Sequence, residues 1–89
     1  MDVAKTLLAY PNVSVEVDGH TDNIGRRSTN LTLSKQRAET VLRWLVDRGG
    51  VPAERLQSVG VGDERPLVPN TTDENRTKNR RVEFHVEKK

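Results

Sequence analysis

Hydrophobic and polar residues alternate along two short segments of this chain, and the longest segment between them follows a helical period. The run from Val13 to Val17 places every second residue on one side, which predicts a strand with one buried face. The run from Arg81 to Val86 alternates in the same way. Between them, apolar residues recur at the i, i+3, i+4, i+7, i+8 spacing of a buried helical stripe. These residues are Ala38, Val41, Leu42, Leu45 and Val46.

Turn-forming residues divide the rest of the chain into further short elements. Pro11 ends a helix predicted over Asp2–Tyr10. The long helix is predicted to begin near Ser28, acting as N-cap, and to end at Gly49-Gly50, where glycine can take the left-handed conformation. A turn over 52–55, a strand over 56–61 and a short polar helix over 72–79 complete an α-β-α-β-α-β order.

Composition narrows the classes of protein that fit this pattern. Eighty-nine residues form one small domain, and with only three aromatic residues the core must be mostly Val, Leu and Ala, with Trp44 expected inside it. The net charge of +2 comes from interspersed acids and bases, so composition does not favour polyanion binding. No cysteine is present, and no apolar run approaches the ~20 residues of a membrane span.

A polar stretch interrupts the buried stripe of the long helix. On a helical wheel Asn30, Ser34 and Arg37 fall within about 60° of one another, and Val41 continues the stripe one turn later. One interpretation is that the helix extends beyond the core and Arg37 reaches solvent. The other is that the polar half lines a pocket beside the strand end that carries Asp22.

Two catalytic or metal-binding interpretations find little support. Asp18, His20 and Asp22 alternate along a strand, but no fourth ligand follows at metal-site spacing, so we expect no metal and interpret His20 as a hydrogen-bonding residue that holds the turn. Ser, His and Asp residues occur without a nucleophile elbow. We therefore expect neither enzymatic activity nor a cofactor.

Three separated motifs resemble the OmpA-like, peptidoglycan-binding domain of Gram-negative envelope proteins. They are Gly-His-Thr-Asp at 19–22, Leu-Ser-x-x-Arg-Ala at 33–38 and Asn-Arg-Arg-Val-Glu at 79–83, and the similarity runs from Val13 to Val86. The resemblance implies an α+β sandwich, with a mixed sheet and helices packed on one face. It also implies an opening strand that residues 1–89 lack, so we expect a single domain truncated at its N-terminus relative to the family. The sheet edge left open would favour a homodimer.

The resemblance also implies a ligand and the residues that hold it. In the family, the positions of Asp22 and Arg37 clamp the diaminopimelate residue of the peptidoglycan stem peptide. Diaminopimelate ends in an ammonium and a carboxylate, which suit an acid and a bidentate guanidinium. Thr21, Asn30 and Leu33 match further family positions around the ligand, and by strand alternation we favour Arg81 over Arg80 as the arginine facing the pocket.

These inferences predict a non-catalytic module that binds peptidoglycan in the periplasm and anchors an outer-membrane or other cell-envelope protein to the wall. One alternative is a small basic nucleic-acid module built on Arg76, Lys78, Arg80 and Arg81, although no aromatic residues are interleaved to stack bases and acidic residues surround these charges. A second alternative is an enzyme acting on peptidoglycan, for which the predicted pocket offers no acid–base pair at a scissile bond.

Overall fold

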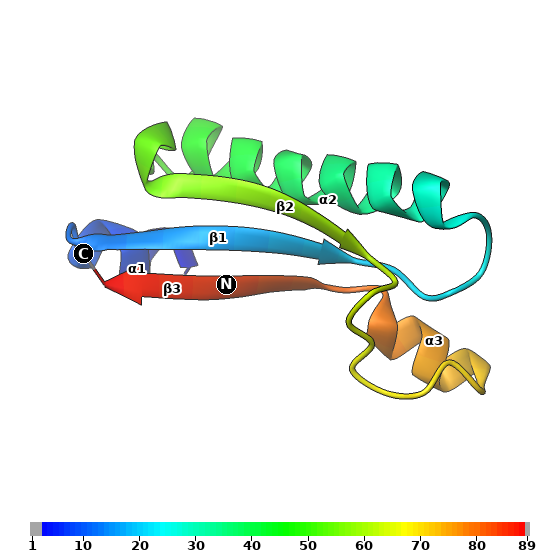
Figure 1. The fold of residues 1–89 in the computed structure, drawn as a ribbon. Helices are drawn as coiled ribbons and strands as arrows, with labels where there is room; N and C mark the ends of the chain where they lie inside the picture. Colours follow the sequence, from blue (N-terminus) through cyan, green and yellow to red (C-terminus); the bar gives the residue numbers. More distant parts are fainter. Residues whose placement is uncertain (1–2, 89) are drawn as a thin grey trace.

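The computed structural model describes residues 3–88 and contains the six predicted elements in the predicted order, with one additional short 3-10 helix (Figure 1). Their bounds are α1 Val3–Ala9, β1 Val13–His20, α2 Arg27–Asp47, η1 Ala53–Arg55, β2 Leu56–Gly62, α3 Asp73–Asn79 and β3 Val82–Lys88. The η1 turn lies where Pro52 predicted one, and the Asp2 end of the first predicted helix lies outside the described residues.

The three strands form one mixed sheet in the order β2-β1-β3. β1 is parallel to β2 and antiparallel to β3, so Val17 lies between Ser58 and Phe84. The parallel connection runs through α2, as a parallel pair requires, since a tight turn cannot join two strands that run the same way. Figure 1 shows β1 in the centre with α2 running along β2.

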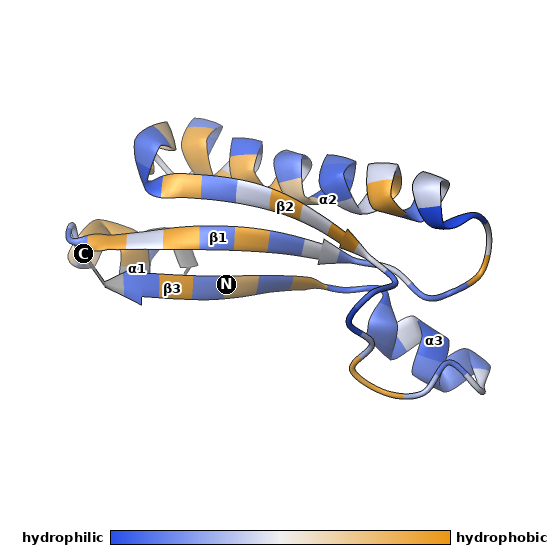
Figure 2. Ribbon diagram, viewed as in Figure 1, coloured by the Kyte–Doolittle hydropathy of each residue, from blue (hydrophilic) through white to orange (hydrophobic). Residues whose placement is uncertain are grey.

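Two helices cover one face of this sheet. Val15 and Val17 from β1 are buried together with Leu7 of α1 and with Ala38 and Leu45 of α2. The alternating bands of β1 and the apolar stripe of α2 are visible in Figure 2. The predicted α+β class, with a mixed sheet and helices on one face, is confirmed; the short α3 lies beyond the strand ends instead of on the face (Figure 1).

Glycine allows α2 to approach the sheet closely. A Cβ atom on Gly19 of β1 would lie 2.0 Å from the backbone oxygen of Ser34, and one on Gly60 of β2 would lie 2.8 Å from that of Leu31. Real Cβ atoms do not tolerate such distances, so these two positions accept only glycine without a shift of the helix. This close contact fixes the N-terminal half of α2 against the strand ends.

The ends of two elements differ from the sequence prediction. β1 continues through Gly19 and His20, because both still pair with neighbouring strands, and the turn begins only at Thr21. α2 begins at Arg27 with Arg26 at the N-cap and no side-chain cap, so the proposed Ser28 cap is wrong; the Ser28 carbonyl instead accepts a hydrogen bond from Thr32. At the other end Gly50 takes the expected left-handed conformation, with φ of 71°.

Trp44 was expected in the core, and that expectation is wrong. Its side chain is 52% exposed, whereas the next residue, Leu45, is 2% exposed. One step along a helix rotates a side chain by about 100°, which is enough to move it from the buried face to solvent.

Within the described residues, none of the helices is long and apolar enough to cross a bilayer.

Candidate functional site

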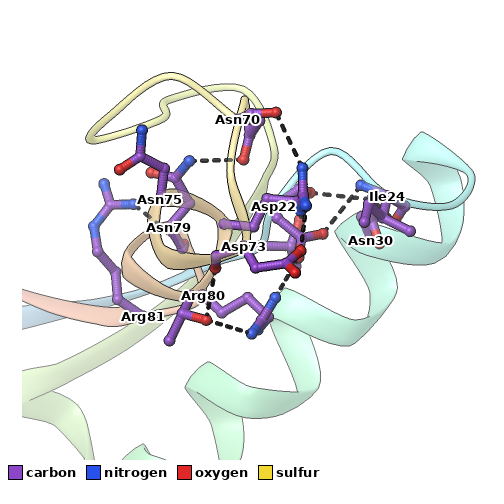
Figure 3. A network of polar contacts seen from close by, with 12 residues as sticks. Asp22, Ile24, Asn30, Asn70, Asp73, Asn75, Asn79, Arg80 and Arg81 are labelled. Carbon is purple, nitrogen blue, oxygen red and sulfur yellow. Dashed lines mark hydrogen bonds and ion pairs between the residues drawn. The ribbon is translucent and has the colours of Figure 1, made fainter.

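The candidate site lies where β1 ends, α2 begins and α3 leads into β3. Asp22 follows β1 after one residue, Arg37 lies at the middle of α2, and Arg80 occupies the C-cap position of α3. Figure 3 shows how the loop after β1, the start of α2 and the residues around α3 meet at this end of the sheet. Segments far apart in the sequence are therefore brought together by the sheet order.

Asp22 is the buried anion of this site. Its side-chain Oδ1 accepts a hydrogen bond of 3.0 Å from the backbone N–H of Ile24, and its Oδ2 lies 2.6 Å from Nη1 of Arg80. Burial opposes ionisation, but the Ile24 N–H and the Arg80 guanidinium outweigh it, so the pKa of Asp22 lies below its ordinary value. Asp22 is thus a fixed carboxylate at neutral pH.

Thr21 and Asn30 hold the loop that carries this carboxylate. The buried Thr21 hydroxyl donates to the backbone oxygen of Asp22 at 2.8 Å. The Asn30 side-chain amide donates to the backbone oxygen of Ile24 at 3.0 Å and to that of Asp22 at 3.4 Å. The Asn30 bonds tie the loop to the first turn of α2 and the Thr21 bond lies within the loop, so both side chains are occupied in positioning Asp22.

Arg37 is exposed and borders an open depression of about 340 Å³. Arg80, Arg81 and Val82 are its other lining residues, so three arginines border one space. Within residues 3–88 no hydrogen bond or ion pair engages the Arg37 side chain, and none joins it to Asp22. A free guanidinium of this kind can hold a carboxylate by two parallel hydrogen bonds.

A second depression adjoins Arg37 and is more apolar. Leu33, Val41 and Val82 contribute its hydrophobic surface, and Arg37 is shared between the two depressions. Leu33 is 40% exposed, which is more than a helix-core leucine would be. The combination offers an aliphatic wall next to a cationic space.

The assignment of the two C-terminal arginines needs correction. Arg80, and not Arg81, contacts Asp22. The Arg81 guanidinium turns toward Glu83, with Nε 2.5 Å from Oε2, and also donates to the backbone oxygen of Arg65. Arg80 lies in the turn before β3 begins, so strand alternation could not predict its direction. Arg81 still borders the Arg37 depression.

Asn79 organises the loop before α3, a role that no local sequence pattern indicates. It is fully buried, and its Oδ1 accepts hydrogen bonds from the backbone N–H groups of Leu67 and Val68 at 2.8 and 3.1 Å. Its amide nitrogen donates to the Val68 carbonyl and to the Asn70 side chain (Figure 3). This network fixes the end of α3 and therefore the position of the adjacent Arg80.

Asp18 and His20 lie on the sheet face opposite α2 and apart from the Asp22 loop. Both are almost fully buried. The His20 ring makes no hydrogen bond to the described residues and lies 3.6 Å from Oε1 of Glu83, whereas Nε2 of His85 lies 3.2 Å from Oδ2 of Asp18. The expected role of the His20 side chain in holding the turn is therefore wrong, and only its backbone N–H bonds there, to the Arg81 carbonyl. Burial lowers the pKa of His20. In the part of the chain that the structure describes, no group of three or more His, Cys, Asp or Glu side chains is arranged to hold a metal.

Known proteins share this fold and sequence pattern. The model of the OmpA family matches residues 1–80. The outer membrane porin F of Pseudomonas aeruginosa is 43% identical over 86 residues, which cover 97% of this chain and 25% of the porin. The peptidoglycan-binding protein ArfA of Mycobacterium tuberculosis is 45% identical over 84 residues, which cover 94% of this chain and 26% of that protein.

A solved structure agrees with the fold as well. The peptidoglycan-associated lipoprotein from Burkholderia pseudomallei superposes with a TM-score of 0.89 at 30% sequence identity, covering 94% of this chain and 70% of that structure. The present chain therefore spans about a quarter of the curated relatives and more than two thirds of the solved domain.

Proposed function

Because the chain belongs to the OmpA family, we propose that it binds peptidoglycan non-covalently and anchors an envelope protein to the cell wall in the periplasm. The observation that carries this proposal is a fixed carboxylate, Asp22, paired with Arg80, which borders the same cationic depression as Arg37. The names of the relatives support it, since one is a peptidoglycan-binding protein and another a peptidoglycan-associated lipoprotein. Binding of this kind requires no catalytic group and no cofactor.

We further propose that the recognised group is the diaminopimelate residue of the stem peptide. Its side chain ends in an ammonium and a carboxylate on the same carbon. Asp22 accepts one bond at each oxygen in the free protein, which leaves carboxylate lone pairs for the ligand ammonium. The unpaired Arg37 fork is then available for the ligand carboxylate.

The other residues act around this pair. Asn30 ties the Asp22 loop to α2 and Thr21 bonds within that loop, while Leu33 offers apolar surface to the methylene groups of the ligand. Arg80 holds Asp22 ionised before the ligand arrives. Arg81 borders the cationic depression and adds positive potential near the ligand carboxylate.

The nucleic-acid alternative is not proposed, because the arginines it would use are already engaged. Arg76 pairs with Asp73, Arg80 with Asp22 and Arg81 with Glu83. A salt titration distinguishes nucleic-acid binding from peptide binding. The affinity for a polyanion falls steeply as salt is added, whereas the affinity of a pocket for a paired ligand falls modestly.

Calorimetry with two stem peptides tests the proposal. One peptide contains meso-diaminopimelate and the other contains lysine, which keeps the ammonium and lacks the carboxylate. We expect binding of the first and a loss of about 2–5 kcal/mol for the second, because the Arg37 side would then have no partner. Arg43→Lys, an exposed arginine further along α2, is the matched control and should bind the diaminopimelate peptide normally. Equal affinity for both peptides contradicts the clamp.

A further inference from the structure

An exposed stripe of α2 carries an aromatic side chain in polar surroundings. Trp44, the single tryptophan of the chain, is 52% exposed. It borders an open depression of about 570 Å³. The other residues lining this depression are all polar or charged: Gln36, Glu39, Thr40, Arg43, Asp47 and Arg48.

This surface is continuous with the candidate site. Leu33, Arg37, Thr40 and Trp44 follow the i, i+4, i+7, i+11 spacing of a single helical stripe. Gln36 and Thr40 line both the depression beside Arg37 and the one beside Trp44. Trp44 lies seven positions after Arg37, which at the rise of an α-helix is about 10 Å along the helix axis.

The side chains around the Trp44 depression suit a sugar ligand better than the buried centre of a protein–protein interface. An aromatic ring can pack against the apolar C–H face of a pyranose, while the surrounding carboxylates, guanidiniums and amides can donate to and accept from its hydroxyl groups. The fully buried centre of a protein–protein interface is depleted in charged residues, whereas four of the seven lining residues here are charged.

We propose that the Trp44 depression binds the glycan strand of the polymer whose stem peptide is held at Asp22 and Arg37, with Trp44 stacked on a sugar ring. This inference rests on the proposed function. The stem peptide is covalently joined to the sugar, so a peptide held at the first site presents its sugar to the second, about 10 Å further along α2, at a high effective concentration.

Three ligands and one spectroscopic signal test the proposal. The ligands are a disaccharide carrying a diaminopimelate stem peptide, the same peptide with the sugars removed, and glycan chains freed of peptide. Because Trp44 is the single tryptophan, its fluorescence reports on this depression directly, while calorimetry gives the affinities. Trp44→Ala is compared with Tyr10→Ala, which removes an aromatic ring that is 62% exposed on another part of the surface.

We expect the sugar-bearing peptide to bind about three- to tenfold more tightly than the bare peptide and to change Trp44 emission, which the bare peptide should not do. Trp44→Ala should abolish that difference and leave bare-peptide affinity unchanged, whereas Tyr10→Ala should retain it. Equal affinities with unchanged emission would overturn the glycan site while leaving the proposed function intact. Emission that changes with protein concentration alone would also overturn it, in favour of a second copy on this face. If the bare peptide fails to bind but free glycan still changes Trp44 emission, the glycan site stands and the peptide clamp fails.

Discussion

Nη1 of Arg80 lies 2.6 Å from Oδ2 of Asp22, although the two residues are 58 positions apart in the sequence. This ion pair joins the loop after β1 to the end of α3, and it explains how the site holds an ionised aspartate that is only 7% exposed. The pair also means that a ligand ammonium meets an Asp22 already oriented and ionised, which reduces the reorganisation needed on binding.

The first prediction concerns the pH at which binding fails. Because Arg80 helps to hold the pKa of Asp22 below its ordinary value, Arg80→Gln should raise that pKa toward or above the ordinary range. Asp22 would then become protonated at a higher pH than in the wild type. A protonated Asp22 no longer attracts the ligand ammonium, so binding should fail at that higher pH. Calorimetry with the diaminopimelate peptide over a pH series measures this midpoint. Identical pH profiles for the two proteins would show that Arg80 does not control the ionisation of Asp22.

A second prediction separates a bidentate contact at Arg37 from a general positive charge. Arg37→Lys retains the charge but replaces the planar fork with a point ammonium, so the peptide should bind at least about 1 kcal/mol more weakly. Arg37→Ala should lose more of the peptide affinity than Arg37→Lys does. Neither change should alter the melting temperature, because the side chain is exposed and makes no hydrogen bond within the described residues. Wild-type affinity in Arg37→Lys refutes bidentate recognition, and wild-type affinity in Arg37→Ala removes the residue from the site.

The close contact between β1 and α2 gives a prediction about stability. In Gly19→Ala the new methyl group would overlap the Ser34 backbone oxygen, which cannot rotate away as a side chain could. We expect a loss of about 3 kcal/mol or more in the free energy of unfolding, measured by urea denaturation. Gly50→Asn is the control, because its Cβ meets no atom within 4 Å and Asn tolerates a left-handed backbone. Similar losses for both variants would contradict the steric explanation.

Stability should also depend on pH through His20. Burial, reinforced by the Arg81 guanidinium, lowers the pKa of His20 in the folded protein. Below about pH 6.5 the unfolded chain therefore binds more protons at this residue than the native state does, so stability falls as the pH decreases through this range and recovers above it. Urea denaturation at pH 5.5 and 7.5 measures the difference, and His20→Asn should diminish it. An unchanged pH dependence in His20→Asn would assign the effect to other groups.

The edge of β3 supports a prediction about assembly. Within the described sheet β3 pairs with β1 on one side only, and Val86 near its end is 64% exposed. Such an edge can pair with a second copy of the chain, so we expect the mass measured by light scattering to rise with concentration. Val86→Lys should reduce that rise by placing a charge on the edge strand. A thermally robust monomer at every concentration would show that the chain does not need a further strand.

The sequence by itself determined the elements and the face of the sheet that is buried. Val15 and Val17 alternate with polar residues, and Ala38 and Leu45 recur at helical spacing, so neighbouring residues alone define which side of each element is apolar. The positions of Asp22 and Arg37 at one end of the sheet also follow from the sequence, because each is anchored to a strongly patterned element.

The tertiary structure decided which polar groups meet. Arg80 reaches Asp22 because Asn79 fixes the end of α3, and this depends on a loop whose hydrogen bonds no local pattern predicts. The exposure of Trp44 likewise depends on how α2 rotates against the sheet, which the close approach at Gly19 sets. Periodicity is a property of a few consecutive residues, whereas these contacts arise between segments that only the folded chain brings together.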